Sequence, residues 1–98
     1  MLEIRRTEVY ARWFRSLGDR QARARIDERI RRISLDNPGD EKPVGEGVFE
    51  MRLNYGPGYR IYYVPRGKQV IVLLAGGDKR TQVWDIRNAI GLARLIEE

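Results

Sequence analysis

Three cationic side chains, Arg52, Arg60 and Lys79, are the residues of this chain whose types and positions could support chemistry. Arg52 and Arg60 lie on either side of the turn sequence Tyr55-Gly56-Pro57-Gly58, so a symmetric hairpin would place them directly opposite each other. Like charges at facing positions destabilise a sheet. The pair therefore requires a negative partner, which is either a carboxylate of the chain or an anionic group of a ligand.

Two carboxylates and one aromatic ring are close to these arginines in the predicted hairpin. The same register places Glu50 opposite Tyr62, on the face that carries both arginines. If Glu50 or Asp78 neutralises the arginines within the chain, no ligand is needed. A ligand phosphate would instead accept bidentate hydrogen bonds from the guanidinium groups, and an exposed Tyr62 could stack on a nucleobase. The residues alone leave both alternatives open.

Lys79 follows an apolar strand that ends in two glycines and leads into a helix. The sequence there is Gly76-Gly77-Asp78-Lys79-Arg80-Thr81-Gln82. Free backbone N–H groups at a helix start favour an anion, and Lys79 would add a positive charge. The spacing of a P-loop is absent. The alternative is a purely structural exit from the strand, in which Asp78 or Thr81 caps the helix.

The basic composition indicates either a solvated basic surface or a polyanionic partner, which would be nucleic acid or an acidic protein, and the residue types exclude several kinds of chemistry. Of 98 residues, 19 are Lys or Arg and 14 are Asp or Glu, and 16 of the 19 cations are arginine. The absence of Cys and His removes disulfides, thiol chemistry, the usual zinc ligands and the commonest general base. We therefore expect no metal and no cofactor. The length of 98 residues predicts a single domain over 1–98. No apolar stretch or signal-like N-terminus suggests a membrane, so we expect a cytoplasmic protein.

Hydrophobic periodicity predicts the elements that position these residues. Strands are expected over 1–6, 48–54, 59–64 and 70–75, and residues 37–47 are expected to be a loop. Thr7 and Asp19 can cap two helices of an N-terminal hairpin. The order β-α-α-β-β-β-α predicts an α+β fold: a mainly antiparallel four-stranded sheet packed on the helical hairpin, with a C-terminal helix. The sheet face with Arg52, Arg60 and Tyr62 is expected to be partly open.

The C-terminal helix is expected to begin at Thr81 or Gln82. Trp84 is interpreted as a core or helix-packing residue, like Trp13 and Phe14. The predicted buried stripe of this helix consists of Val83, Ile86, Ala89, Ile90, Ala93 and Ile96.

Taken together, the motifs resemble those of a known family. Glu50-Met51-Arg52, Gly56-Pro57-Gly58-Tyr59-Arg60 and Gly76-Gly77-Asp78-Lys79 are similar to motifs of the RelE/ParE toxin superfamily. More narrowly, the chain resembles the HigB-like or phage Gp49-like addiction-module killer proteins, and the resemblance covers essentially the whole chain.

This resemblance implies a RelE-like fold and the toxin of a type II toxin–antitoxin module. It implies a cognate helix-turn-helix antitoxin, operator DNA bound through the toxin–antitoxin complex, and metal-independent cleavage of mRNA in the ribosomal A site. A ribose 2′-hydroxyl attacks the adjacent phosphate in that chemistry. The matching catalytic positions are Arg52, Arg60 and Lys79, and the implied RNA-binding residues are Tyr62, Arg80 and Gln82.

The chain also departs from parts of the family pattern. Some relatives use a histidine as the base, and RelE has a functional tyrosine after its last strand; neither residue is carried over to this chain. Two other functions therefore stay open beside the mRNA endoribonuclease. One is a ParE-like DNA gyrase poison without RNase activity. The other is a non-catalytic remnant that binds antitoxin and operator DNA.

Overall fold

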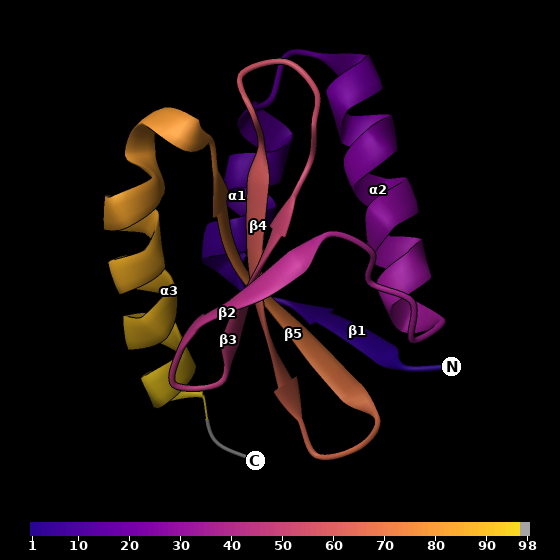
Figure 1. The fold of residues 1–98 in the computed structure, drawn as a ribbon, viewed down its shortest axis with the longest axis vertical. Coiled ribbons are helices and arrows are strands. Elements are labelled where there is room, and N and C mark those ends of the chain that lie inside the picture. The colour runs from indigo at the N-terminus through magenta and orange to yellow at the C-terminus, as the bar shows by residue number, and fades with distance from the viewer. Residues whose placement is uncertain (97–98) are drawn as a thin grey trace.

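The computed structural model describes residues 1–96 and has a five-stranded sheet with helices on both faces (Figure 1). The strand order is β1-β5-β4-β3-β2; β1 pairs in parallel with β5, and every other pair is antiparallel. The elements are β1 (Glu3–Arg6), α1 (Glu8–Ser16), α2 (Arg20–Ser34), β2 (Glu41–Gly45), β3 (Val48–Arg52), β4 (Arg60–Arg66), β5 (Val70–Gly77), a 3-10 turn η1 (Lys79–Thr81) and α3 (Gln82–Leu95). The predicted α+β class is therefore confirmed, and each helix and strand that was predicted is present.

Both predicted helix caps of the N-terminal hairpin are present. The Thr7 hydroxyl accepts a hydrogen bond from the Tyr10 backbone N–H at 3.0 Å and begins α1. The Asp19 carboxylate accepts from the backbone N–H groups of Gln21 and Ala22 and begins α2. Each cap satisfies N–H groups that have no partner within the helix, so the two helices start where the sequence predicts.

The hairpin register is also as predicted. Arg52 pairs with Arg60 and Glu50 pairs with Tyr62 across β3 and β4. The prediction that residues 37–47 form a loop is wrong for Glu41–Gly45, which adds β2 as a fifth strand beside β3. Pro43 removes a ladder donor and a bulge follows it, but an edge strand tolerates both because only one of its sides is paired.

The sheet face expected to be partly open is covered by α3 around Tyr62 and Leu74 (Figure 1), and it stays open only at the end that carries Arg52. The helical hairpin packs against one face in a core that includes Ile26, Met51 and Ile61. The opposite face packs Tyr62 and Leu74 against α3. Tyr62 has no exposed surface, and β4 is buried from Arg60 to Val64. The polar side chains of Glu50 and Tyr62 on this face are therefore buried beside the start of α3.

Helix α3 begins at Gln82 as predicted, but its first turn is exposed. Val83 is 70% exposed and Trp84 is 64% exposed, so their assignment to the buried stripe and to the core is wrong. Trp84 precedes the buried Ala93 by nine residues, about two and a half turns, and therefore points to the opposite side of the helix. The buried or partly buried residues of the stripe are Ile86, Ala89, Ile90, Ala93 and Ile96. No helix among residues 1–96 is both long and apolar enough to cross a bilayer.

Candidate functional site

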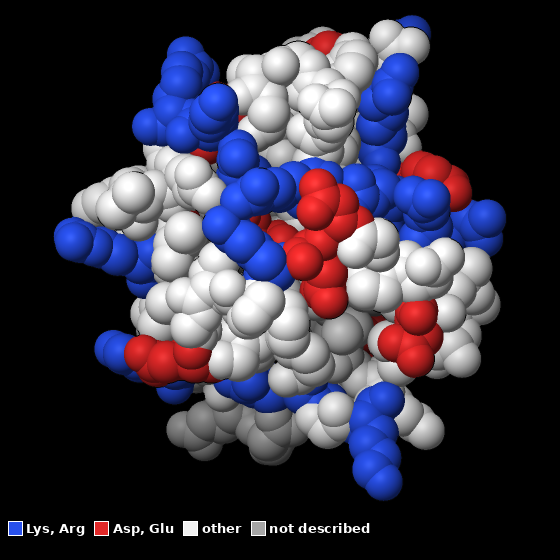
Figure 2. All heavy atoms as spheres, in the orientation of Figure 1, with Lys and Arg blue, Asp and Glu red and all other residues white. Residues whose placement is uncertain are grey.

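The structure brings the three predicted cations together. Arg52 at the end of β3, Arg60 at the start of β4 and Lys79 after β5 line one cleft of about 490 Å³. The rest of its wall comes from the β3–β4 loop and Asp40. Figure 2 shows Lys and Arg atoms as a belt across one face of the molecule, below this loop. The antiparallel register and the exit of β5 thus build a basic cleft from three separate segments.

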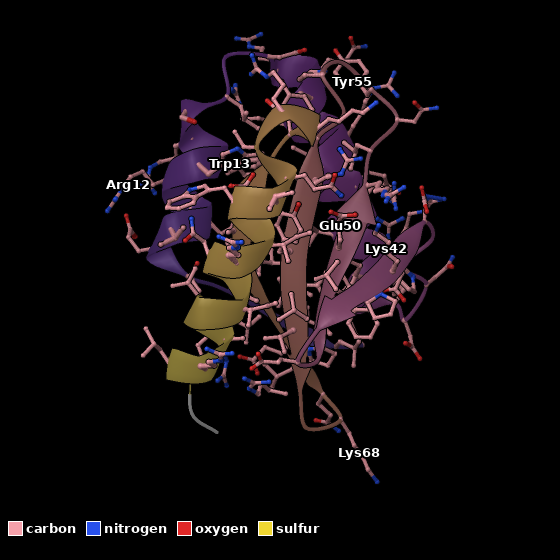
Figure 3. All side chains as sticks on the ribbon, turned by 60° about the vertical axis from the view of Figure 1, so that its left-hand side comes forward. Arg12, Trp13, Lys42, Glu50, Tyr55 and Lys68 are labelled. Atoms are coloured by element: carbon pink, nitrogen blue, oxygen red, sulfur yellow. The ribbon has the colours of Figure 1, made fainter. Side chains whose placement is uncertain are left out.

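A fully buried carboxylate, Glu50, lies behind these cations. Its Oε1 accepts a hydrogen bond from Arg52 Nε at 3.0 Å and is 3.9 Å from Lys42 Nζ. Its Oε2 accepts from Tyr62 OH at 3.0 Å and from Gln82 Nε2 at 2.8 Å. Figure 3 shows Glu50 beside α3, with Lys42 on the neighbouring strand. Both oxygens therefore accept hydrogen bonds, from donors of β3, β4 and α3, and Lys42 of β2 adds a positive charge at ion-pair distance.

The environment of Glu50 favours its ionised form. Burial by itself would raise the pKa of this carboxyl group. Hydrogen bonds from Gln82, Arg52 and Tyr62 outweigh the burial, and the nearby Arg60 charge adds to them, so the pKa lies below its usual value. Because Glu50 is ionised and has no exposed surface, it serves to hold its neighbours rather than to contact a ligand.

Neutralisation within the chain, the alternative to a ligand anion, is present but incomplete. Glu50 contacts both arginines, with Arg60 Nε 3.5 Å from its Oε2. Asp78, the other candidate, forms its ion pair with Arg80, and the Arg60 charge contributes less to the lowering of its pKa. Around the cleft, four cations (Arg52, Arg60, Lys42 and Lys79) face two carboxylates (Glu50 and Asp40). A surplus of two positive charges remains, which suits a phosphate.

Arg60 forms the floor of the cleft, because only 9% of it is exposed. Its guanidinium donates to the Gly58 carbonyl at 3.0 Å. Gly58 has a φ of 81°, in the left-handed region that favours glycine, and this conformation turns its carbonyl toward Arg60. The β3–β4 turn therefore fixes Arg60, while Arg52 and Lys79 keep more of their surface open to solvent.

The segment between β5 and Lys79 is a strand exit whose glycines are required by close packing and whose helical turn is capped within the chain, as the alternative to an anion site predicted. A Cβ atom on Gly76 would lie 2.2 Å from the Trp13 ring, and one on Gly77 would lie 1.9 Å from Asp85 Oδ2. Asp78 caps η1 by accepting from the Arg80 backbone N–H at 2.9 Å. A hydrogen bond from the Arg80 side chain is the main reason that the pKa of Asp78 is lowered. The turn that presents Lys79 is thus already capped by a carboxylate.

The three predicted RNA-binding residues have different positions. The Arg80 side chain is exposed and paired with Asp78. Gln82 is partly buried and donates to Glu50. The expectation that Tyr62 is exposed is wrong: burial, with Glu50 beside it, raises the pKa of this phenol, and its ring has no free face for a base.

Two residues near the cleft were not predicted from the sequence. Lys42 was assigned to a loop, and its approach to Glu50 depends on the unpredicted strand β2. Trp84 was assigned to the core, but it lines a second depression together with Lys79, Arg80 and Arg87. The helical phase of Trp84 relative to Ala93 was the signal that could have identified it as exposed.

The fold has close counterparts among solved structures. A mutant of the E. coli toxin RelE in the free state superposes with a TM-score of 0.73 at 21% identity, covering 97% of this chain and 98% of that one. A chain of the intact E. coli RelBE toxin–antitoxin complex gives a TM-score of 0.68 at 20% identity, covering 80% of this chain and 96% of that one. The protein therefore has a RelE-like fold.

Sequence comparison gives the family. The family model "Phage derived protein Gp49-like (DUF891)" matches residues 12–94. A Haemophilus influenzae protein, described as uncharacterized, is 40% identical over 93 residues, which are 95% of this chain and 94% of that protein. The chain belongs to the phage Gp49-like family.

Proposed function

We propose that the protein is the toxin of a type II toxin–antitoxin module and that it cleaves mRNA on the ribosome without a metal ion. One observation carries this proposal: Arg52, Arg60 and Lys79 line a single cleft that keeps a surplus of positive charge. A phosphodiester backbone is the anion that matches such a cleft in a Gp49-like protein with a RelE-like fold.

The chemistry that fits the cleft is attack within the RNA itself. The ribose 2′-oxygen forms a bond to the adjacent phosphorus, and the bond from phosphorus to the 5′-oxygen of the next nucleotide breaks. The 2′-hydroxyl loses a proton and the leaving 5′-oxygen gains one. Negative charge accumulates on the phosphoryl oxygens between these events, so cations already aimed at them lower the barrier.

The positions of the cations suggest a role for each. Arg52 and the exposed Lys79 reach the phosphoryl oxygens directly. Arg60 acts from the floor of the cleft, where its charge stabilises the phosphate. Lys79 is the candidate for proton transfer or charge stabilisation. Glu50 orients Arg52 and Arg60 but is too buried to take a proton from the RNA.

An exposed ring next to Lys79 supplies a candidate contact for a base. Trp84 takes the stacking role that the sequence suggested for Tyr62. Arg80 and Arg87 lie in the same depression and suit a flanking phosphate, while Gln82 supports the site by holding Glu50. These contacts would orient the strand so that one phosphate lies over Arg52 and Lys79.

The proposed partners follow from the same comparisons. The E. coli RelBE structure is a toxin–antitoxin complex, and we extend an antitoxin partner to this chain. A helix-turn-helix antitoxin would bind the toxin and carry it to operator DNA. The net charge of +5 favours RNA surfaces such as the ribosomal A site.

Induction in a bacterial host, with 5′ ends mapped along a translated reporter mRNA, tests this function. Wild-type protein should create new 5′ ends within the reading frame, and Arg52→Ala and Lys79→Ala should remove them. Lys68→Ala is the matched control, since Lys68 lies at the opposite end of the sheet (Figure 3). Inhibited DNA supercoiling without new mRNA ends would contradict the proposal and favour a gyrase poison.

A further inference from the structure

A second groove lies beside the cleft, between α2 and the β3–β4 loop. Its volume is about 580 Å³, and it shares Leu53 and Asn54 with the cleft. Arg29 lines the groove and donates to the backbone carbonyl of Arg52, which lines the cleft, at 2.7 Å, so the two depressions adjoin here. A strand leaving the cleft over Asn54 would enter this groove directly.

The charges in the groove are suited to an anion. Arg25, Arg29 and Arg32 line it together with a single carboxylate, Glu28. Glu28 is within ion-pair distance of Arg31, at 3.5 Å, and Arg31 does not line the groove. Among residues 1–96, no carboxylate forms an ion pair with Arg25 or Arg32. These two guanidinium groups are therefore available to a partner.

One of these arginines is held in place by an aromatic ring. The Arg25 guanidinium lies 4.5 Å from the centre of the Tyr55 ring. The Tyr55 hydroxyl is fixed in turn by Asp19 and Gln21, at 2.9 and 3.3 Å. A guanidinium stacked on a ring keeps its N–H groups in the plane, where they can form bidentate hydrogen bonds with phosphate.

We propose that this groove is a second RNA-binding subsite, in which Arg25 and Arg32 bind backbone phosphates of the strand that leaves the cleft. The inference rests on the proposed function, because it extends the path of the same RNA. The aliphatic floor from Ala24 and Leu53 suits the flat face of a base, and the arginines suit the phosphate beside it. The groove therefore sets how many nucleotides the protein contacts.

Binding of single-stranded 2′-O-methyl RNA, which cannot be cleaved by 2′-attack, distinguishes the contribution of the groove to RNA affinity from that of the cleft. Fluorescence anisotropy is measured over a salt series with a 4-nucleotide and a 12-nucleotide oligomer. Wild-type protein is compared with Arg25→Gln/Arg32→Gln. The matched control is Arg12→Gln/Arg20→Gln, which removes the same charge from exposed residues outside both grooves.

We expect Arg25→Gln/Arg32→Gln to weaken binding of the long RNA by about tenfold at 0.1 M salt. The slope of the logarithm of the binding constant against the logarithm of the salt concentration should become shallower by about 1.4, since each lost phosphate contact on a single strand removes about 0.7. The short RNA should bind as before, and the control should match wild type with both oligomers. Arg52→Ala should weaken the short RNA, which reports on the cleft alone.

Three results would overturn the subsite. One is an unchanged salt slope for binding of the long RNA by Arg25→Gln/Arg32→Gln. Another is an equal loss of affinity for both oligomers, because that loss would reflect the lower net charge of the variant rather than a subsite. Unchanged RNA binding together with lost co-purification of the cognate antitoxin would assign the groove to a protein partner. The proposed function fails separately, if Arg52→Ala leaves binding of the short RNA unchanged.

Discussion

Glu50 and Arg52 lie two residues apart on β3, and Arg52 Nε donates to Glu50 Oε1 over 3.0 Å although Glu50 has no exposed surface. A buried carboxylate thus holds one end of an arginine whose other end is open to the cleft. Because the same carboxylate also binds Tyr62 and Gln82, it links the basic cleft to β4 and to the start of α3.

Glu50→Gln should lower the free energy of unfolding by about 3 kcal/mol, because it leaves the nearly buried Arg60 without its counter-charge. Urea unfolding at neutral pH measures the change. Glu28→Gln is the control: its pair with Arg31 is exposed, so the loss should stay within about 0.5 kcal/mol. Equal stability of the two variants would show that Glu50 does not hold the arginines.

The contribution of Glu50 should depend on pH in a defined direction. Its pKa in the folded protein is below the usual 4.5, so the ionised form stabilises the fold above that value. The stability difference between wild type and Glu50→Gln should be full at pH 7 and should shrink as the pH falls below 4.5 toward the lower folded pKa. Urea unfolding of both proteins from pH 7 to pH 3 tests this. A gap that widens in acid would reverse the assigned sign.

Two glycine substitutions should change stability in opposite directions. Gly76→Ala places a methyl group 2.2 Å from the Trp13 ring and should cost about 1–3 kcal/mol. Gly91→Ala lies within α3 with nothing within 4 Å of the new Cβ atom, and it should stabilise by about 0.5–1 kcal/mol. Thermal unfolding of the two variants provides the comparison. A stable Gly76→Ala protein would contradict the close contact between β5 and α1.

Trp84→Ala should weaken RNA binding without unfolding the protein. Loss of one stacked base costs about 1–3 kcal/mol of binding free energy. The fold should lose no more than about 0.5 kcal/mol, since the side chain is 64% exposed. Trp84→Phe should recover part of the affinity, and Leu95→Ala, on an exposed position far along α3, should have no effect. Fluorescence anisotropy with non-cleavable RNA measures these affinities. If Trp84→Ala bound RNA as tightly as wild type, Trp84 would not contact the RNA.

The sequence predicted those features of the fold that depend on local rules. Thr7 and Asp19 cap their helices because their side chains satisfy nearby N–H groups. The Gly-Pro-Gly turn sets the register that pairs Arg52 with Arg60. The position of Lys79 at the exit of the last strand, together with the family resemblance, also grouped it with the two arginines, and the three line one cleft.

The errors concern relations between distant segments. Glu50 and Tyr62 read as solvent-facing residues, but they form a hydrogen bond with each other, and Glu50 also pairs with Arg60, so both can be buried beside α3. Helical periodicity found most of the stripe of α3 but wrongly included Val83, which is 70% exposed. In the first turn, Gln82 and Asp85 are the residues that lie against the sheet. Strand β2 carries a proline and a bulge, which hide its pattern.

Single-turnover cleavage in a reconstituted translation system tests the central claim most directly. Purified wild-type, Arg52→Ala, Lys79→Ala and Lys68→Ala proteins are added to ribosomes that hold a defined mRNA with an open A site. We expect rate constants about 10²–10³-fold lower for Arg52→Ala and Lys79→Ala, wild-type rates for Lys68→Ala, and 2′,3′-cyclic phosphate ends on the product. Equal cleavage by all four proteins, or no cleavage by wild type, would contradict a cleft built from Arg52, Arg60 and Lys79 for RNA phosphodiester chemistry.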